Sequence, residues 1–295
     1  MKKHLARGGL FLAALIWGSG YVVSAWALEY FKPLQVMALR FTIAFLVLLA
    51  VNFKTLRDFK VSSIKKGCII GTFLFLGFSL QLVGLQYTTV SKNAFLTAVN
   101  VVIVPILGFA IYRREIGKDS IVGAMVTLAG IGLLSLKGQE SGLNIGDLLT
   151  LSGAFFFALQ IFYTEEYLDD MTSGEMILTQ MGTSAILSWI SVIFLKQTDF
   201  NFSLESGRII IYMGLVTTLL TYVLQILCQR YTTASETAII LSSESMFGMI
   251  SSAILLKEAV TPFMIMGSVL IILGILTVET KPLNRILYKK GGLES

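Results

Sequence analysis

The feature that most constrains this chain is a series of apolar stretches, each about 20 residues long and nearly free of Asp, Glu, Lys and Arg. A stretch of this length spans the hydrocarbon core of a bilayer as an α-helix, because lipid offers the backbone no other hydrogen-bonding partner. The alternating pattern of barrel strands is not seen. We therefore predict an all-α integral membrane protein with ten transmembrane helices, at residues 8–28, 34–53, 67–91, 93–112, 120–136, 148–164, 176–195, 209–229, 237–256 and 259–278.

The composition agrees with a chain that has lipid as its solvent. Of its 295 residues, 55% are hydrophobic and only 14% are charged, which is too apolar for a soluble domain. A net charge of +5 is also typical of proteins with an acidic partner, but the basic residues fall where membrane topology puts them. With a cytoplasmic N-terminus, 16 of the 23 Lys and Arg residues lie in cytoplasmic segments. We expect a multi-pass protein of the cell membrane, with both termini cytoplasmic and no nucleic-acid partner.

The N-terminal segment admits a second interpretation. Lys2, Lys3 and Arg7 precede an apolar run that ends near Ala25-Trp26-Ala27, and this order resembles a signal peptide with a small-residue cleavage site. Against this interpretation, the apolar run is long for a signal peptide and has a repeat partner later in the chain.

The chain contains an internal repeat. GLQYTTVSKNA at residues 84–94 aligns with CQRYTTASETA at residues 228–238, an offset of 144 residues. The repeat predicts two copies of a five-helix unit, at residues 1–138 and 139–295. Because five is odd, the second copy enters the membrane from the opposite side, and the pair predicts a transporter with a site near the midplane. The alternative is a duplicated membrane protein that transports nothing.

Several segments carry a family pattern in a fixed order. They are LIWGSGYV at residues 15–22, PLQVMALRFTIA at residues 33–44, and longer segments at residues 87–134 and 231–276. Together they resemble the EamA type of the drug/metabolite transporter superfamily over nearly the whole chain. One departure is Glu244-Ser245, where the family often has Glu-Pro, so a proline bend is not implied there. The resemblance implies a ten-helix exporter of amino acids and other metabolites.

Polar residues inside the predicted spans are the candidates for the binding site, since such groups face the bundle interior or a wet cavity. Gln81 and Gln225 are partners at the 144-residue offset. Each continues a stripe of small or polar residues at helical spacing. A stripe of this kind is also typical of a helix-packing seam. The paired glutamines favour a cavity.

The fourth and ninth spans carry a second polar stripe. Asn93, Thr97 and Asn100 share a helical face, and Glu244 stands at the position equivalent to Asn100. An ionised carboxylate at that depth costs roughly 2.5 to 3.5 kcal/mol, so Glu244 must be protonated, paired or solvated. We expect it to carry a coupling proton or to select a cationic group of the solute. The alternative is a structural ion pair with Arg40.

Aromatic residues occur on the same faces as the polar candidates. Trp17 and Tyr21 lie on the first span, Phe156 and Gln160 on the sixth, and Tyr222 on the eighth. Such stripes are usually core packing, but apolar walls with a few amides and one carboxylate suit an amphipathic solute.

Other residues indicate structure instead of binding. Arg40 matches the arginine of the family's second-helix pattern, and we expect it to anchor on carbonyls or a lipid headgroup. The fifth and tenth spans have no strong polar group, and we assign to helix packing their glycines Gly123, Gly130, Gly267 and Gly274.

Enzyme chemistry lacks support in this sequence. The chain has one His, at position 4, and neither an HExxH nor a GxxxxGK[ST] motif. Cys68 and Cys228 lie inside predicted spans, so neither a disulfide nor a metal pair is expected. We expect no enzyme activity, no cofactor and no metal.

These observations predict a secondary transporter of small polar or amphipathic metabolites, such as amino acids or amines, that works by alternating access. Without a phosphate-binding loop, uphill movement would use proton coupling or exchange. The alternatives are a channel-like facilitator and a receptor or scaffold of the membrane, although no ring of charges or carbonyl filter favours a channel.

Overall fold

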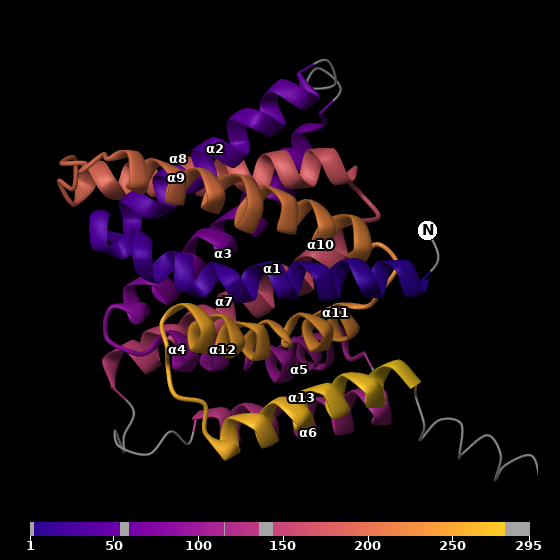
Figure 1. Ribbon diagram of the computed structural model, residues 1–295. Helices are drawn as coiled ribbons and strands as arrows, with labels where there is room; N and C mark the ends of the chain where they lie inside the picture. Colours follow the sequence, from indigo (N-terminus) through magenta and orange to yellow (C-terminus); the bar gives the residue numbers. More distant parts are fainter. Residues whose placement is uncertain (1–2, 54–58, 115, 136–143, 281–295) are drawn as a thin grey trace, which may run out of the picture.

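A computed structural model describes residues 3–53, 59–114, 116–135 and 144–280, and every regular element in these ranges is a helix. The helices pack alongside one another in a single bundle (Figure 1). In chain order they are α1 (Lys3–Tyr30), α2 (Pro33–Asn52), α3 (Val61–Leu85), α4 (Val90–Thr97), α5 (Asn100–Tyr112), α6 (Lys118–Ser135), α7 (Ile145–Tyr167), α8 (Ser173–Phe194), α9 (Leu204–Tyr212), η2 (Met213–Leu220), α10 (Thr221–Gln229), α11 (Ala234–Leu241), α12 (Glu244–Leu255) and α13 (Pro262–Thr280).

Within the described residues, eight helical segments are long and apolar enough to cross a membrane. Three of them combine shorter helices, because α4 with α5, α9 with η2 and α10, and α11 with α12 each form one continuous segment. A ninth apolar stretch, Pro262–Val278 of α13, is shorter. The predicted all-α membrane class is therefore confirmed, and the count of ten spans stays a prediction.

The packing pattern is unchanged when the two halves of the chain are exchanged. α1 packs on α10 and α12, while its predicted counterpart α7 packs on α3 and on α4 and α5. α2 packs on its counterpart α8, and α6 on its counterpart α13. This exchange symmetry is what an inverted repeat would produce. The two-repeat division stays a prediction, and its boundary between residues 138 and 139 lies outside the described residues.

The pair formed by α6 and α13 lies at one edge of the bundle (Figure 1). A Cβ atom on Gly123 would lie 2.9 Å from the carbonyl oxygen of Gly274, and one on Gly274 would lie 2.7 Å from that of Gly123. A Cβ on Gly130 would lie 2.6 Å from the carbonyl oxygen of Gly267. Small residues thus allow two backbones to touch, in agreement with the predicted packing role.

Two membrane segments are broken at equivalent places. The first is interrupted at residues 98–99, between α4 and α5, and the second at residues 242–243, between α11 and α12. The backbone crosses each break with a tight turn, because Val99 N–H donates to Leu96 O at 3.3 Å and Ser243 N–H to Ile240 O at 3.2 Å. Each break therefore creates a helix start inside the bundle, at α5 and at α12.

Candidate functional site

A cavity lies in the middle of the bundle, between the two helix breaks. Its empty space is about 570 Å³ when the part open to the outside is included. The volume available to the centre of a water molecule is about 50 Å³. That is room for a few waters or a small solute. Its lining comes from both halves of the chain: Trp17, Gly20, Tyr21, Ser24, Arg40, Phe78, Gln81, Thr97, Asn100, Phe157, Gln160, Ile161, Thr217, Tyr222, Gln225, Leu241 and Glu244.

Most of the residues predicted to bind solute meet in this cavity. Eight of the ten line it: Trp17, Tyr21, Gln81, Asn100, Gln160, Tyr222, Gln225 and Glu244. They come from α1, α3, α5, α7, α10 and α12, so residues up to 227 positions apart in sequence converge. Their roles in binding stay predictions, but the structure places them around one space.

Two predicted residues lie outside the lining. Asn93 donates from Nδ2 to the Gln81 carbonyl oxygen at 3.1 Å and to Thr150 Oγ1 at 2.8 Å, so it braces α4 against α3 and α7. Phe156 faces Phe73, with ring centroids 6.4 Å apart. Its neighbour Phe157 lines the cavity instead, because one residue turns a helix by about 100°.

Glu244 is the first residue of α12 and is 7% exposed. The positive end of the helix dipole favours a negative charge at a helix start, so the break itself provides part of the environment for this carboxylate. The Tyr21 hydroxyl donates to Glu244 Oε1 at 3.0 Å. Gln81 Nε2 in turn donates to the Tyr21 oxygen at 3.3 Å and to Thr97 Oγ1 at 2.9 Å. A chain of hydrogen bonds therefore joins the two broken helices through α1 and α3.

Arg40 lines the same cavity and is 2% exposed. Its Nε donates to Thr218 Oγ1 at 2.8 Å and its Nη2 to the Thr217 carbonyl oxygen at 3.4 Å. The guanidinium also lies 4.4 Å from the centre of the Phe78 ring, a cation–π distance. Arg40 thus reaches a carbonyl, and no ion pair with Glu244 occurs among the described residues.

The backbone around Thr217 is a π-helix, η2, whose wider turns are typical of functional sites. The Thr217 carbonyl oxygen accepts from Trp17 Nε1 at 3.0 Å and from Thr221 Oγ1 at 2.8 Å in addition to Arg40. The equivalent part of α3 is a regular α-helix. The π-helix therefore supplies an acceptor that holds Trp17 and Arg40 on the cavity wall.

Aromatic rings form the apolar part of the wall. Tyr222 lies edge-on to Trp17 with centroids 5.1 Å apart, and Phe78 lies edge-on to Phe157 at 4.9 Å. Phe78 and Tyr222 are 6.3 Å apart, so the four rings form one continuous set. The described residues include no group of three or more His, Cys, Asp or Glu that could hold a metal ion.

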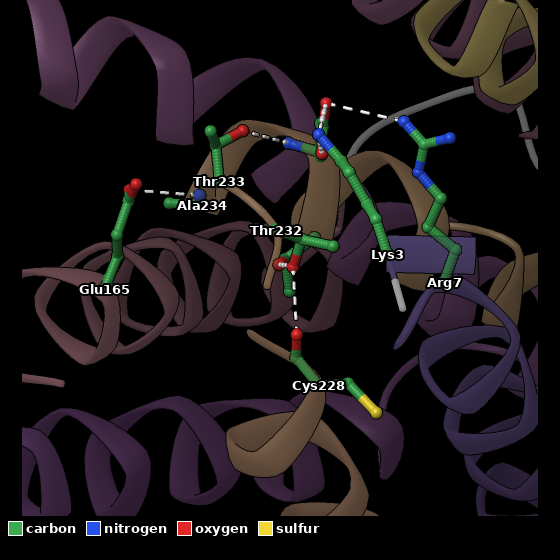
Figure 2. Close-up of polar contacts among 9 residues, drawn as sticks. Lys3, Arg7, Glu165, Cys228, Thr232, Thr233 and Ala234 are labelled. Atoms are coloured by element: carbon green, nitrogen blue, oxygen red, sulfur yellow. Dashed lines mark hydrogen bonds and ion pairs between the residues drawn. The ribbon is translucent and has the colours of Figure 1, made fainter. Parts of the chain in front are cut away.

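One end of the bundle is closed by ion pairs around the start of α1. We call this face the α1 end; α7 and α10 end there, and α8 and α11 begin there (Figure 1). Lys3 Nζ lies 2.9 Å from Glu236 Oε2, and Arg7 Nη2 lies 3.6 Å from Glu236 Oε1. Figure 2 shows Lys3 and Arg7 reaching toward α11, while Glu165 accepts from the Ala234 N–H at 3.0 Å.

The opposite face, which we call the far end, is closed in an equivalent way. Lys92, on the first turn of α4, lies 2.6 Å from Oδ2 of Asp147, on the first turn of α7. The Asp147 side chain is 0% exposed and also accepts from Thr88 Oγ1 at 2.9 Å. Nearby, Ser91 Oγ donates to Glu258 at 2.6 Å. Ion pairs thus join the two halves of the chain at both ends of the bundle.

The sequence pattern of the EamA-like transporter family matches residues 7–136 and 144–280. The chain belongs to this family. An uncharacterized transporter of Archaeoglobus fulgidus is 34% identical to this EamA-like chain over 281 residues, covering 95% of the chain and 88% of the relative. The uncharacterized transporter YetK of Bacillus subtilis is 26% identical and covers 88% and 82%. The protein is therefore a multi-pass membrane protein of a transporter family.

A solved structure shares the fold of this EamA-like chain. A crystal structure of another protein superposes with a TM-score of 0.75, covering 92% of this chain and 95% of its own, at 15% sequence identity. At that identity the likeness shows the fold alone.

Several cavity residues of the EamA-like chain were not predicted from the sequence. Phe78, Phe157 and Thr217 have no unusual sequence pattern, since phenylalanine and threonine are common in membrane helices. Gln180 and Gln229, which lie behind the cavity, were missed although they carried a usable signal. Both are amides within or at the end of apolar stretches, the criterion that selected Gln81 and Gln225.

Proposed function

We propose that this EamA-like protein is a secondary transporter that carries a small solute of the amino-acid or amine class across the cell membrane by alternating access. The observation that carries the proposal is that a basic residue, Arg40, and an acidic residue, Glu244, line one cavity and form no ion pair with each other among the described residues. Each side chain is then available to an ionised group of the solute. A zwitterion, with a carboxylate for Arg40 and an ammonium for Glu244, satisfies both.

The remaining walls suit the rest of such a molecule. The rings of Trp17, Phe78 and Tyr222 provide an apolar surface, and the amides of Gln81 and Asn100 offer hydrogen bonds. Asn100 Oδ1 is buried and has no hydrogen-bond partner in the described residues, so a solute N–H group would satisfy it. Small volume, apolar walls and few polar groups are typical of sites for small ligands.

Alternating access is supported by the ion pairs that join the two halves at each end of the bundle. At the α1 end, Glu236 of α11 pairs with Lys3 of α1, and at the far end Lys92 of α4 pairs with Asp147 of α7. Each pair joins the start of the fourth helix of one half to the start of the first helix of the other half. We propose that the ends open in turn, by movement of the two inverted halves about the cavity. We further propose export as the direction, with both termini in the cytoplasm.

Coupling is assigned to Glu244. It is the one acidic residue among those that line the cavity, and its carboxylate accepts a hydrogen bond from Tyr21. We propose that Glu244 exchanges its proton for the ammonium group of the solute, which couples transport to a proton gradient; exchange of one solute for another is the alternative.

The test is transport by the purified protein in liposomes. A panel of labelled amino acids, amines and nucleobases is offered with and without a pH gradient, and saturable counterflow identifies a carrier. Glu244→Gln should lower amino-acid counterflow about 100-fold and remove its response to the pH gradient, since a lost charge contact costs about 2 to 5 kcal/mol. Asp169→Asn, at an exposed carboxylate, is the matched control and should transport normally.

Three results would contradict the proposal. Flux without saturation or counterflow would indicate a channel-like facilitator. Binding without any flux would indicate a receptor or scaffold. A Glu244→Gln variant with unchanged transport and an unchanged pH profile would reject the role of this carboxylate.

A further inference from the structure

Four buried glutamines from three helices meet beside the cavity, on its α1-end side. They are Gln160 on α7, Gln180 on α8, and Gln225 and Gln229 on α10, and we call them the glutamine cluster. Their exposed fractions are between 0% and 1%. Gln160 and Gln225 line the cavity, while Gln180 and Gln229 lie outside its lining. The cluster therefore extends the polar surface of the cavity into the bundle.

The hydrogen bonds between these amides are long. Gln225 Nε2 donates to Gln160 Oε1 at 3.2 Å and to Gln229 Oε1 at 3.3 Å, and Gln160 Nε2 donates to Gln180 Oε1 at 3.4 Å. Ordinary N–H···O bonds are centred near 2.9 to 3.0 Å. Long bonds are weak, so another donor or acceptor can replace them at little cost.

Two amide atoms of the cluster have no hydrogen-bond partner in the part of the chain that the structure describes. Gln180 Nε2 and Gln225 Oε1 are buried and form no hydrogen bond with the described residues. An unmet buried donor or acceptor costs about 1 to 3 kcal/mol, and in lipid no solvent relieves it from outside. One free donor and one free acceptor together match a group that both accepts and donates, such as an amide, a hydroxyl or water.

The glutamine cluster lies nearer to the α1 end of the bundle than to the far end. Gln160 lies five residues before Glu165, so the cluster lies within about 10 Å of the contacts that close the α1 end. Thr164 continues the polar surface, because Gln160 Nε2 donates to Thr164 Oγ1 at 3.3 Å. Toward the far end the repeat differs: Leu85 stands at the position equivalent to Gln229. The polar extension of the cavity at this position therefore points to one face of the membrane.

We propose that the glutamine cluster lines the route by which the solute passes between the cavity and the α1 end, and that its amides bind neutral hydrogen-bonding groups of the solute on the way. Water occupies the same positions when no solute is present. Gln180 is then a binding residue of the route, although it lies outside the cavity lining. The inference rests on the proposed transport function, but the course of the route can be tested without any solute.

The test of the route uses single cysteines in a Cys68→Ala, Cys228→Ala background. A charged thiol reagent, 2-sulfonatoethyl methanethiosulfonate, is added to the α1-end face of sealed vesicles. Gln180→Cys probes the cluster, and Asn100→Cys probes the cavity. The matched control is Ser184→Cys, one turn along α8, because Ser184 is also 0% exposed but donates to the Gly71 carbonyl oxygen in a contact between α8 and α3.

We expect Gln180→Cys to react within about tenfold of the rate of Asn100→Cys, and Ser184→Cys about 100-fold more slowly, because the control reacts only after local opening of the bundle. The proposal is overturned if Asn100→Cys reacts from this face while Gln180→Cys does not. It is equally overturned if neither reacts, or if Ser184→Cys reacts as fast as Gln180→Cys. If Gln180→Cys fails to fold, Gln229→Cys replaces it with the same expectations.

The hydrogen-bonding role needs a second measurement, counterflow of a labelled amino acid that the wild type transports. Gln180→Met keeps the length of the side chain and removes its donor, and it should slow counterflow about tenfold with less than about a twofold change in half-saturation. An unchanged rate would reject the role of the amide. If no amino acid is transported, the proposed function fails while the cysteine labelling still decides where the route runs.

Discussion

The two broken helices, α4–α5 and α11–α12, have the same backbone but carry different charges. In each, a threonine caps the start, the first part has eight residues, and a two-residue break follows. Lys92 stands in the first turn of α4 where Glu236 stands in α11. Asn100 begins α5 where Glu244 begins α12. Side-chain charge therefore distinguishes two elements that the backbone makes equivalent.

This difference in side-chain charge makes the two broken helices contribute unequally to the cavity and to the two ends of the bundle. The cavity receives its carboxylate from the second half alone, because the equivalent residue of the first half is a neutral amide. The two ends are closed by ion pairs in which the α4–α5 segment supplies the cation and the α11–α12 segment supplies the anion. We propose that this difference lets the cavity hold one asymmetric solute in one orientation.

The largest effect is expected where α1 packs on α12 beside the second break. A Cβ atom on Gly18 would lie 2.3 Å from Phe247 Cβ and 2.8 Å from Gly248 N, so Gly18→Val cannot be accommodated by a side-chain movement. The cost should exceed the roughly 1 to 3 kcal/mol of ordinary overpacking, and we expect loss of folded protein in gel filtration and thermal unfolding. Gly8→Val on the same helix meets nothing within 4 Å and should fold normally. A stable Gly18→Val variant would show that α1 does not need this contact.

The next effect concerns Asn100 and Glu244, the first residues after the two breaks. Exchanging them, as Asn100→Glu with Glu244→Asn, keeps one carboxylate in the cavity but moves it away from the Tyr21 hydroxyl, 3.0 Å from Glu244. We expect amino-acid counterflow to stay about 100-fold below wild type, as in Glu244→Gln alone, because the charge no longer faces its partner. Recovery of transport by the exchanged variant would mean that either half can supply the carboxylate. The difference in charge between Asn100 and Glu244 would then not determine function.

A smaller effect is expected from opening each end separately. Lys92→Gln leaves the Asp147 side chain, which is 0% exposed, without this cation, whereas Glu236→Gln leaves Lys3 and Arg7, whose side chains are 46% and 11% exposed. Both changes weaken one closed end, so we expect Asn100→Cys to react about tenfold faster from the far end in Lys92→Gln and from the α1 end in Glu236→Gln. The larger of the two effects should be that of Lys92→Gln. Acceleration from the same face in both variants would contradict the assignment of one ion pair to each end.

The smallest effect is expected for the hydrogen bond that links the two halves. Tyr21→Phe removes the donor to Glu244 and the acceptor for Gln81, and we expect about a fivefold loss of counterflow at unchanged folding. Tyr222→Phe is the matched control, since no hydrogen bond of the Tyr222 hydroxyl occurs in the described part of the chain; its loss should be below about twofold. Equal losses in both variants would place the effect in the aromatic wall and not in the hydrogen bond.

Much of the fold could be predicted from the sequence, because hydrophobicity over about 20 residues decides whether a segment enters lipid and backbone hydrogen bonding makes it a helix. The same reasoning brought Gln81, Gln225 and Glu244 to the interior, since a polar group avoids lipid. It selected Phe156, which faces Phe73, whereas the next residue, Phe157, lines the cavity. Periodicity marks a face only to within about one residue, which is enough to exchange a cavity wall for a packing contact.

The sequence by itself determined the class of protein, the repeated polar residues and the family, all of which depend on properties that are local to the chain or repeat at a fixed offset. Only the tertiary structure decided where the helices break, because neither Ala98-Val99 nor Ser242-Ser243 contains glycine or proline. It alone brought Gln160, Gln180 and Gln225 together from three helices. Contacts between distant helices fix which side chains meet, and no local property of the sequence contains that information.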